Sequence, residues 1–154
     1  RTEMLRHGHR GYVPQFGVIC MDRITIVTKI PSAALSPNSR SHWRVKHKAS
    51  KSVKKATAAG VQIAMSIDGK PEGVPWHEVE LQATYYHKCK RRRDPDNLIA
   101  LLKYPIDGLV VGGLLVDDDQ ITLKPVLRLI DKDNPRLEMT ISPLSVAANV
   151  EQQQ

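Results

Sequence analysis

The sequence predicts an α+β fold in which a mixed β-sheet carries two main helices, in the order strand, helix, strand, helix, strand, strand. Several short segments rich in β-branched and aromatic residues alternate between apolar and polar positions, as half-buried strands do. Two longer segments repeat apolar residues every three or four positions, which is typical of a helix that buries one face. With 154 residues, 41% of them hydrophobic, the chain is long enough for one domain with a core.

The first half of the chain contains a predicted strand, a loop and a helix. Residues 1–20 lack periodicity, and we expect an extension that precedes a domain of residues 21–142. Ile24 to Ile30 is β-branched and alternates, which predicts the first strand. A segment rich in Ser, Pro and Asn follows, and it predicts a loop. Residues 45–67 then predict a helix that ends at Asp68 and Gly69. The apolar face expected for this helix consists of Val53, Ala56, Val61, Ala64 and Ile67.

The second half begins with a predicted strand from Val79 to His87. A second helix is expected to start at Asp94, because Asp suits the N-cap and Pro95 suits the first helical position. Pro105 lacks a backbone donor, so it is expected to kink or split this helix just after Lys103. The predicted buried stripe consists of Leu98, Leu101, Leu102, Ile106, Leu109 and Val110.

Two further strands are predicted near the C-terminus. The first covers residues 120–130 and is interrupted by Pro125, and the second covers residues 136–141. Residues 143–154 lack a core pattern, and we expect a frayed tail.

The charge balance favours a polyanionic partner. Lys and Arg number 23 against 16 acidic residues, which gives a net charge of +7. Cys20 and Cys89 have no zinc-type spacing, and we expect a reduced intracellular compartment. The apolar runs fall far short of the ~20 residues that span a bilayer, and no signal-peptide pattern is present. The sequence therefore predicts a cytoplasmic protein without a membrane partner.

Three basic segments are candidates for contact with phosphates. The loop before the first helix has two open interpretations: a substrate-facing loop, or an ordinary connector whose Trp43 enters the core. The first half of the first helix is interpreted either as phosphate-binding or as solvated charge. The basic run before the second helix could be a localisation-type tail, but it is internal, and its arginines could bind phosphate oxygens. The candidate DNA-binding residues are Asn38, Arg40, Trp43, Arg44, Lys48, Lys51, Arg91, Arg92, Arg93 and Asn97.

Two acidic groups stand at the two ends of the second helical region. Asp94 and Asp96 precede it, and Asp117, Asp118 and Asp119 follow it. Two carboxylates about 4 Å apart repel by roughly 4 kcal/mol at an effective dielectric of about 20. If the groups converge, they therefore need protons or a cation, and an all-oxygen set suits Mg²⁺ or Mn²⁺. The alternative is purely structural, because the same Asp-Pro-Asp motif is a good helix start.

One side of the predicted second helix carries polar residues at helical spacing. Asp96, Ala100, Lys103 and Asp107 follow one another at intervals of four, three and four residues. Helical side chains lean toward the N-terminus, so the Lys103 ammonium could approach the acidic end. The alternative is a surface pair between Lys103 and Asp107.

These motifs together resemble the RusA family of Holliday junction resolvases, over residues 24–141. The residues that carry the resemblance are Arg93-Asp94-Pro95-Asp96-Asn97, Lys103, Asp107-Gly108-Leu109, Gly113, Asp117, Asp118 and Gln120, with Pro37, Asn38, Trp43 and Arg44 upstream. Phages and prophages commonly encode such proteins. The resemblance implies a RusA-like fold and a homodimeric crossover junction endodeoxyribonuclease that needs Mg²⁺ or Mn²⁺. It also implies that the protein binds four-way DNA junctions and places symmetric nicks, in a bacterial or phage-infected cell.

The resemblance assigns metal binding to Asp94, Asp96 and Asp118, with Asp117 as a neighbouring ligand. The family often has its active-site lysine where this chain has Ala100, and Lys103 is the nearest candidate. In the expected mechanism, the metal generates hydroxide from bound water and neutralises charge on the phosphate. Lys103 and Arg93 would stabilise the transition state, and Asn97 would hold a carboxylate or the phosphate. A two-fold dimer would match paired cuts.

Two other functions are compatible with the same residues. One is a metal-dependent nuclease for other branched DNA or for structured RNA. The other is a non-catalytic DNA-binding or structural protein, in which the aspartates only cap a helix and close a turn.

Overall fold

The computed structural model of the chain describes residues 23–119 and 121–144. The strands are β1 (Ile24–Thr28), β2 (Val79–His87), β3 (Ile121–Leu123), β4 (Leu127–Ile130) and β5 (Arg136–Pro143). The helices are α1 (Trp43–Ile67), α2 (Pro95–Leu101), α3 (Lys103–Val111) and the short 3-10 helix η1 (Ala33–Leu35). The predicted extension of residues 1–20 lies outside the described residues, as does the predicted tail beyond residue 144.

The strands form one mixed sheet, as predicted, with the order β1-β5-β2-β3 and with β4 also paired to β2. β5 is antiparallel to both β1 and β2, whereas β3 and β4 run parallel to β2. Where one strand was predicted over residues 120–130, the described residues 121–130 form two short strands along one edge of β2. Pro125 lies between them, and its carbonyl accepts a hydrogen bond from Gln82 Nε2 at 2.9 Å. The interruption follows from proline, which has no N–H to give to the sheet.

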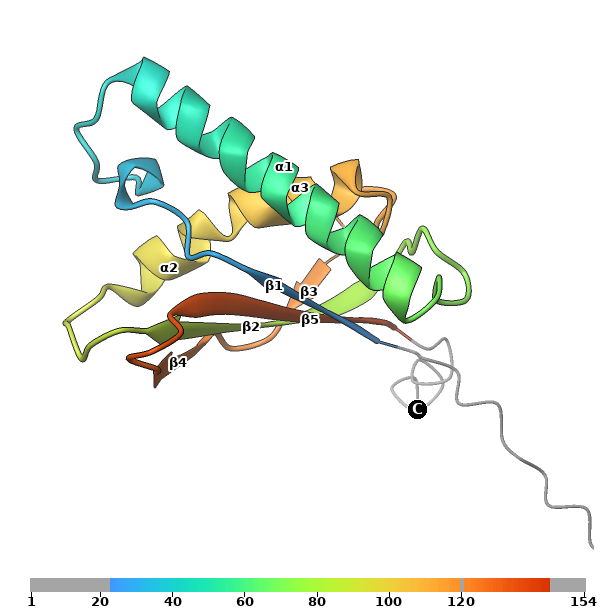
Figure 1. The fold of residues 1–154 in the computed structure, drawn as a ribbon. Helices are drawn as coiled ribbons and strands as arrows, with labels where there is room; N and C mark the ends of the chain where they lie inside the picture. The colour runs from blue at the N-terminus through green and yellow to red at the C-terminus, as the bar shows by residue number, and fades with distance from the viewer. Residues whose placement is uncertain (1–22, 120, 145–154) are drawn as a thin grey trace, which may run out of the picture.

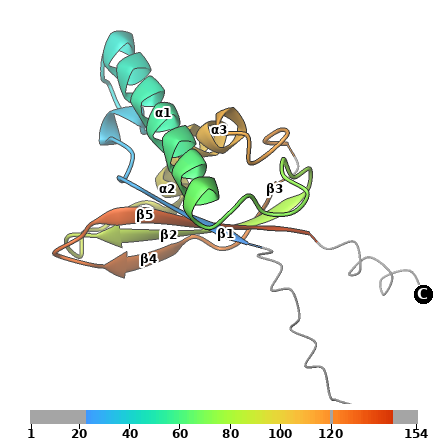
Figure 2. The ribbon, with the colours of Figure 1, turned by 45° about the vertical axis from the view of Figure 1, so that its right-hand side comes forward.

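All three α-helices lie on one face of the sheet (Figures 1 and 2). Alternate residues of β2 point into the space between the layers, and Val79, Leu81, Ala83 and Tyr85 are completely buried there. The core is completed by Ile24, Ile26, Val61, Trp76, Leu98, Leu102, Leu109, Leu114, Leu137, Met139 and Ile141. This packing fixes α2 and α3 along β2, so the loop before α2 lies near the C-terminal end of that strand.

The second helical region is broken at Leu102, just before Lys103, and not just after it as predicted. Leu102 N donates to Ile99 O at 3.0 Å, which tightens the last turn of α2, and α3 then begins at Lys103. Pro105 is tolerated because the first turn of a helix needs no N–H donors. Pro105 therefore breaks the helix about one turn before its own position, at Leu102. The predicted buried stripe is confirmed for Leu98, Leu101, Leu102 and Leu109, with Ile106 and Val110 partly buried.

Other boundaries and faces differ slightly from the prediction. β1 ends at Thr28, two residues early, and α1 starts at Trp43 because the His42 side chain caps it, with Nδ1 accepting from Arg44 N at 3.2 Å. β5 extends to Pro143, beyond the predicted end at residue 141. Ile67, expected on the apolar face of α1, is 77% exposed. At 100° per residue it lies about 240° around the helix from buried Val61, so it belongs to another face. Ala56 is exposed for the same reason.

Candidate metal and nucleic-acid site

Asp94 occupies the N-cap of α2, as predicted. Its Oδ1 accepts a hydrogen bond from Asp96 N at 3.3 Å, and Pro95 follows as the first helical residue. Both carboxylates are exposed at the positive end of the helix. A carboxylate has about four acceptor positions, so capping occupies only part of the capacity of Asp94. The structural role and a ligand role are therefore compatible at this residue.

The loop after η1 is tied to the first turn of α2 through Asn97. Ser36 Oγ and Asn38 Nδ2 both donate to Asn97 Oδ1 at 3.4 Å. These contacts bring together two residues that are distant in sequence and that were both predicted to contact DNA, Asn38 and Asn97. The loop thereby becomes a wall of the same site as Asp94.

A cavity of about 460 Å³ lies between this loop and the start of α2. Ser36, Arg92, Arg93, Asp94 and Asn97 contribute polar groups to its wall. The remaining lining is mostly apolar and includes Pro31, Leu98 and Leu101. A carboxylate and two guanidinium groups thus face one space, which suits a metal ion on one side and a phosphate on the other.

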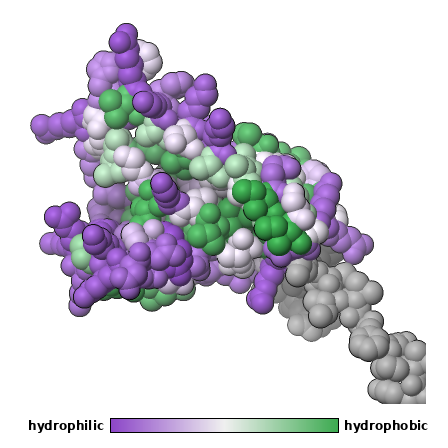
Figure 3. All heavy atoms as spheres, viewed as in Figure 1, coloured by the Kyte–Doolittle hydropathy of each residue, from purple (hydrophilic) through white to green (hydrophobic). Residues whose placement is uncertain are grey.

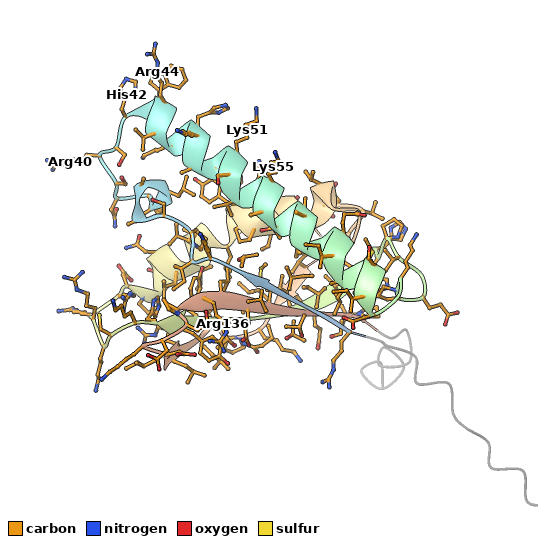
Figure 4. All side chains as sticks on the ribbon, viewed as in Figure 1. Arg40, His42, Arg44, Lys51, Lys55 and Arg136 are labelled. Carbon is orange, nitrogen blue, oxygen red and sulfur yellow. The ribbon has the colours of Figure 1, made fainter. Side chains whose placement is uncertain are left out.

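Trp43 is 65% exposed, so the interpretation that places it in the core is wrong. Arg44 lies over its indole ring at 5.5 Å from the ring centre, and the His42 ring is 5.8 Å away. Figure 4 shows Arg40 and Arg44 extending outward at the start of α1, with Lys51 and Lys55 along the outer side of the helix. Lys48 is exposed as well. Figure 3 shows hydrophilic side chains gathered at this end of the molecule. An exposed aromatic ring among cations is a typical nucleic-acid-binding surface.

The basic run before α2 lies on the other side of the cavity. Arg93 is half-buried and its Nη1 donates to Cys89 O at 3.2 Å, which folds the loop back on itself. Arg128 of β4 donates from Nη1 to Arg93 O at 3.0 Å, directly before Asp94. Arg91 and Arg92 are exposed. The loop that carries the predicted arginines is therefore anchored to the sheet.

The second acidic group lies elsewhere. Leu115 pairs with Trp76, and β3 then begins opposite Val79, so the exposed turn of Asp117, Asp118 and Asp119 lies beside the N-terminal end of β2. Asp117 Oδ1 accepts from Asp118 N at 2.7 Å and closes this turn. Asp94 lies beyond the C-terminal end of β2, which is eight residues further, or about 26 Å at 3.3 Å per residue. In Figure 1, α2 and the segment that follows α3 lie toward opposite ends of the sheet.

The predicted convergence of Asp94 and Asp96 with Asp118 is therefore not found within one chain. Among residues 23–119 and 121–144, no three His, Cys, Asp or Glu side chains are grouped so that they could hold a metal ion. Lys103 is exposed at the start of α3, and Asp107 pairs with Lys54 of α1 at 2.5 Å, not with Lys103 as the alternative proposed. The structure brings together Asp94, Asp96, Asn97, Asn38 and Arg93, and leaves Asp117 and Asp118 apart.

Two residues of the site were not anticipated from sequence. His87 is buried at the end of β2 and lines the cavity, and Arg128 projects from β4. The pKa of His87 lies below its ordinary value, first because of burial and then because of repulsion by Arg93 and Arg128. Strand alternation places His87 on the inner face of β2, but nothing in the sequence places β4 beside it.

Neither models of known protein families nor curated proteins match this chain. None of the helices in the described part of the chain is long and apolar enough to cross a membrane.

Proposed function

We propose that the protein is a RusA-like, Mg²⁺-dependent endodeoxyribonuclease that resolves Holliday junctions by paired symmetric nicks during recombination and repair. One observation carries this proposal: the exposed Asp94 borders a cavity whose polar wall also includes Arg92, Arg93 and Asn97, and the exposed Asp96 stands beside it in the first turn of α2. Carboxylates for a hard cation and guanidinium groups for a phosphate are the two requirements of metal-assisted phosphodiester hydrolysis.

The donor set fits Mg²⁺ or Mn²⁺, because Asp94, Asp96 and Asp118 offer only oxygen atoms. Such a cation, when bound, supplies an acidified water and neutralises charge on the phosphate. Arg93 is oriented by the carbonyl of Cys89 and would contact the non-bridging phosphate oxygens as charge develops on them. Asn97 holds the Ser36–Asn38 loop against α2, so its role here is to keep one wall of the cavity in place.

The separation of the two acidic groups is accounted for by a homodimer. In a two-fold dimer, any contact from one chain to its partner is repeated in the opposite direction. If the Asp117–Asp119 turn of one chain approaches the start of α2 in the other, two equivalent sites form, each with ligands from both chains. Two equivalent sites also match two symmetric cuts. In this proposal Asp118 acts across the dimer interface.

Branched DNA is the proposed substrate because the basic elements share one end of the molecule with Asp94. The loop before α1, the start of α2 and the loop after β2 lie at that end in both ribbon views (Figures 1 and 2). Exposed Trp43 offers a surface on which an unpaired base at a branch point could stack. Arg40, Arg44, Lys48 and Lys51 would bind the flanking phosphates.

A cleavage assay with carboxylate variants tests the proposal. Asp94→Asn, Asp96→Asn and Asp118→Asn should each reduce nicking of a four-way junction by at least about 100-fold, in keeping with the size of electrostatic contributions to catalysis. Junction binding should persist in all three. Asp133→Asn is the matched control, because Asp133 is an exposed turn carboxylate that belongs to neither acidic group and does not line the cavity. Nicking by Asp94→Asn at the wild-type rate would refute the assignment.

The alternatives are separated by substrate and metal. Forks, flaps, duplex, single strands and structured RNA, compared at equal salt, should all be cut more slowly than the junction. Preference for another substrate would support a nuclease of different specificity. A wild-type protein that binds DNA, but that neither binds Mn²⁺ in calorimetry nor cuts any of these, would be a non-catalytic DNA-binding protein.

A further inference from the structure

A second cavity, of about 360 Å³, lies at the ends of β2 and β4, on the other side of Arg93 from the first. Its polar lining consists of His87, Lys90, Arg91, Arg93 and Arg128. No Asp or Glu is among the residues that line it. Four cationic side chains around one space repel one another, and a bound anion relieves that repulsion.

Arg93 lines both cavities and Arg128 lines the second, and backbone carbonyls orient both side chains, without a carboxylate. Arg93 donates to Cys89 O at 3.2 Å, and Arg128 donates to Arg93 O at 3.0 Å. Arg136 on the same sheet shows the opposite arrangement, because Asp131 and Glu138 both contact its guanidinium at 2.6 Å. The structure thus holds Arg93 and Arg128 in place, and in the part of the chain that it describes no ion pair neutralises their charges.

His87 adds an unsatisfied polar atom to the same place. The side chain is 94% buried, and its Nε2 has no hydrogen-bond partner among the described residues. The ring is stacked on Tyr85, with ring centres 5.7 Å apart and planes 4° from parallel, so its orientation is fixed. A buried polar group without a partner is costly, and a ligand that offers an acceptor oxygen removes this cost.

We propose that this cavity is an anion site that takes one phosphate of the DNA backbone, held by Arg93, Arg128 and His87. The site lies next to the cavity that Asp94 borders, because Arg128 contacts the carbonyl of Arg93, the residue before Asp94. The phosphate bound here positions the strand and is not the one that is cleaved, and Arg93, which lines both cavities, lies between the two phosphates. The identity of the ligand rests on the proposed function, whereas the anion site itself rests on the geometry.

The test compares salt dependence of junction binding, with Ca²⁺ in place of Mg²⁺ so that binding is measured without nicking. Each phosphate contact contributes close to one unit to the slope of log affinity against log salt, so Arg128→Gln should lower that slope by about one and weaken binding about tenfold. Lys124→Gln is the matched control: it removes one positive charge from the same edge of the sheet, but Lys124 is already neutralised by Glu80 at 2.7 Å. Its slope should stay at the wild-type value.

His87→Phe is the second variant, since it keeps the stack on Tyr85 and removes Nε2. It should weaken binding several-fold and leave the slope unchanged, because a neutral donor releases no counterion. Melting curves check that each variant folds. If Arg128→Gln does not fold, the double variant Lys90→Gln/Arg91→Gln, at two exposed positions of the same cavity, replaces it in the test. Equal slopes and affinities for Arg128→Gln and Lys124→Gln would overturn the anion site. Cleavage in Mg²⁺ is scored separately. If Arg128→Gln lowers the salt slope but the wild-type protein does not nick the junction, only the nuclease proposal fails. If the wild-type protein nicks the junction but Arg128→Gln leaves the salt slope unchanged, only the anion site fails.

Discussion

At the scale of single residues, the side chain that links the core to the candidate site is Tyr85. Its hydroxyl is buried and donates to Leu98 O of α2 at 2.9 Å. That carbonyl is available because Leu102 N, its usual helical donor, bonds to Ile99 O instead. Burial raises the pKa of Tyr85, so the hydroxyl keeps its proton. Tyr85 therefore fixes the helix that begins with Asp94 to the centre of the sheet.

Tyr85→Phe should lower the free energy of unfolding by about 1 to 2 kcal/mol, because a buried carbonyl loses its donor while the ring packing is kept. Denaturant unfolding measures this loss. Tyr86→Phe is the control, since Tyr86 lies on the opposite face of β2 beneath Arg136. Equal stability of the two variants would contradict the role given to the Tyr85 hydroxyl.

His87 predicts a pH dependence of stability. Its pKa in the folded protein is lowered by burial, and then by Arg93 and Arg128, so the unfolded chain binds a proton more readily than the folded one. Stability from this residue is complete above the unfolded value of about 6.5 and is lost as pH falls through the lowered pKa. The free energy of unfolding should therefore decrease between about pH 7 and pH 5.

The measurement is urea unfolding at both pH values. His87→Phe should reduce the difference between them, whereas His77→Gln, at an exposed position, should not. A His87→Phe variant with the full wild-type pH dependence would show that another group is responsible.

For single residues, the sequence predicts which side chains have suitable chemistry better than it predicts which of them lie close together. Asp94, Asp96, Asn97 and Asn38 could be chosen from residue type and helix-start patterns, and the structure places them together. His87 and Arg128 could not, because their importance depends on β4 lying beside the end of β2. That pairing is a long-range property with no local signal in the chain.

At the scale of elements, the α1–α3 contact positions the helices above the sheet. Gly108 allows the close approach: a Cβ built there would lie 2.6 Å from Thr57 Cβ and 2.8 Å from Lys54 O. The Lys54–Asp107 ion pair lies at the same contact. The glycine in the Asp107-Gly108-Leu109 segment is therefore explained by packing, without any role in chemistry.

Gly108→Ala should destabilise the protein by about 1 to 3 kcal/mol, although alanine favours an isolated helix, because the added carbon overpacks a backbone contact. Gly60→Ala makes a useful comparison, since its Cβ would meet only a methyl group of Ile26 at 3.3 Å. Thermal melting should show a clear loss for the first variant and little change for the second. A stabilised Gly108→Ala protein would contradict the close packing described here.

Most elements could be predicted from local patterns, with small errors at their ends. β2 has the predicted bounds, and Pro125 interrupts the edge strand as expected. The break between α2 and α3 was misplaced because the effect of Pro105 falls on the preceding turn. The parallel pairing of β2 with β3 was not predicted, and it is this pairing that sends Asp118 to the far end of β2.

At the scale of the whole molecule, the two acidic groups lie at opposite ends of the same strand. A single ion cannot contact both within one chain when about 26 Å separate the strand ends. The proposed metal site therefore requires two chains, each of which supplies carboxylates that the other lacks. This requirement makes activity depend on protein concentration, because a monomer would lack half of its ligands.

The most direct test mixes two inactive variants. Asp94→Asn and Asp118→Asn proteins are unfolded together, refolded and assayed on a four-way junction in Mg²⁺. In a mixed dimer one site carries both substitutions and the other carries neither, so nicking should return, in one strand of each junction and not as paired cuts. Refolding of either variant alone is the control and should give no product. No activity in the mixture, with dimers confirmed by sedimentation, would contradict a site shared between chains.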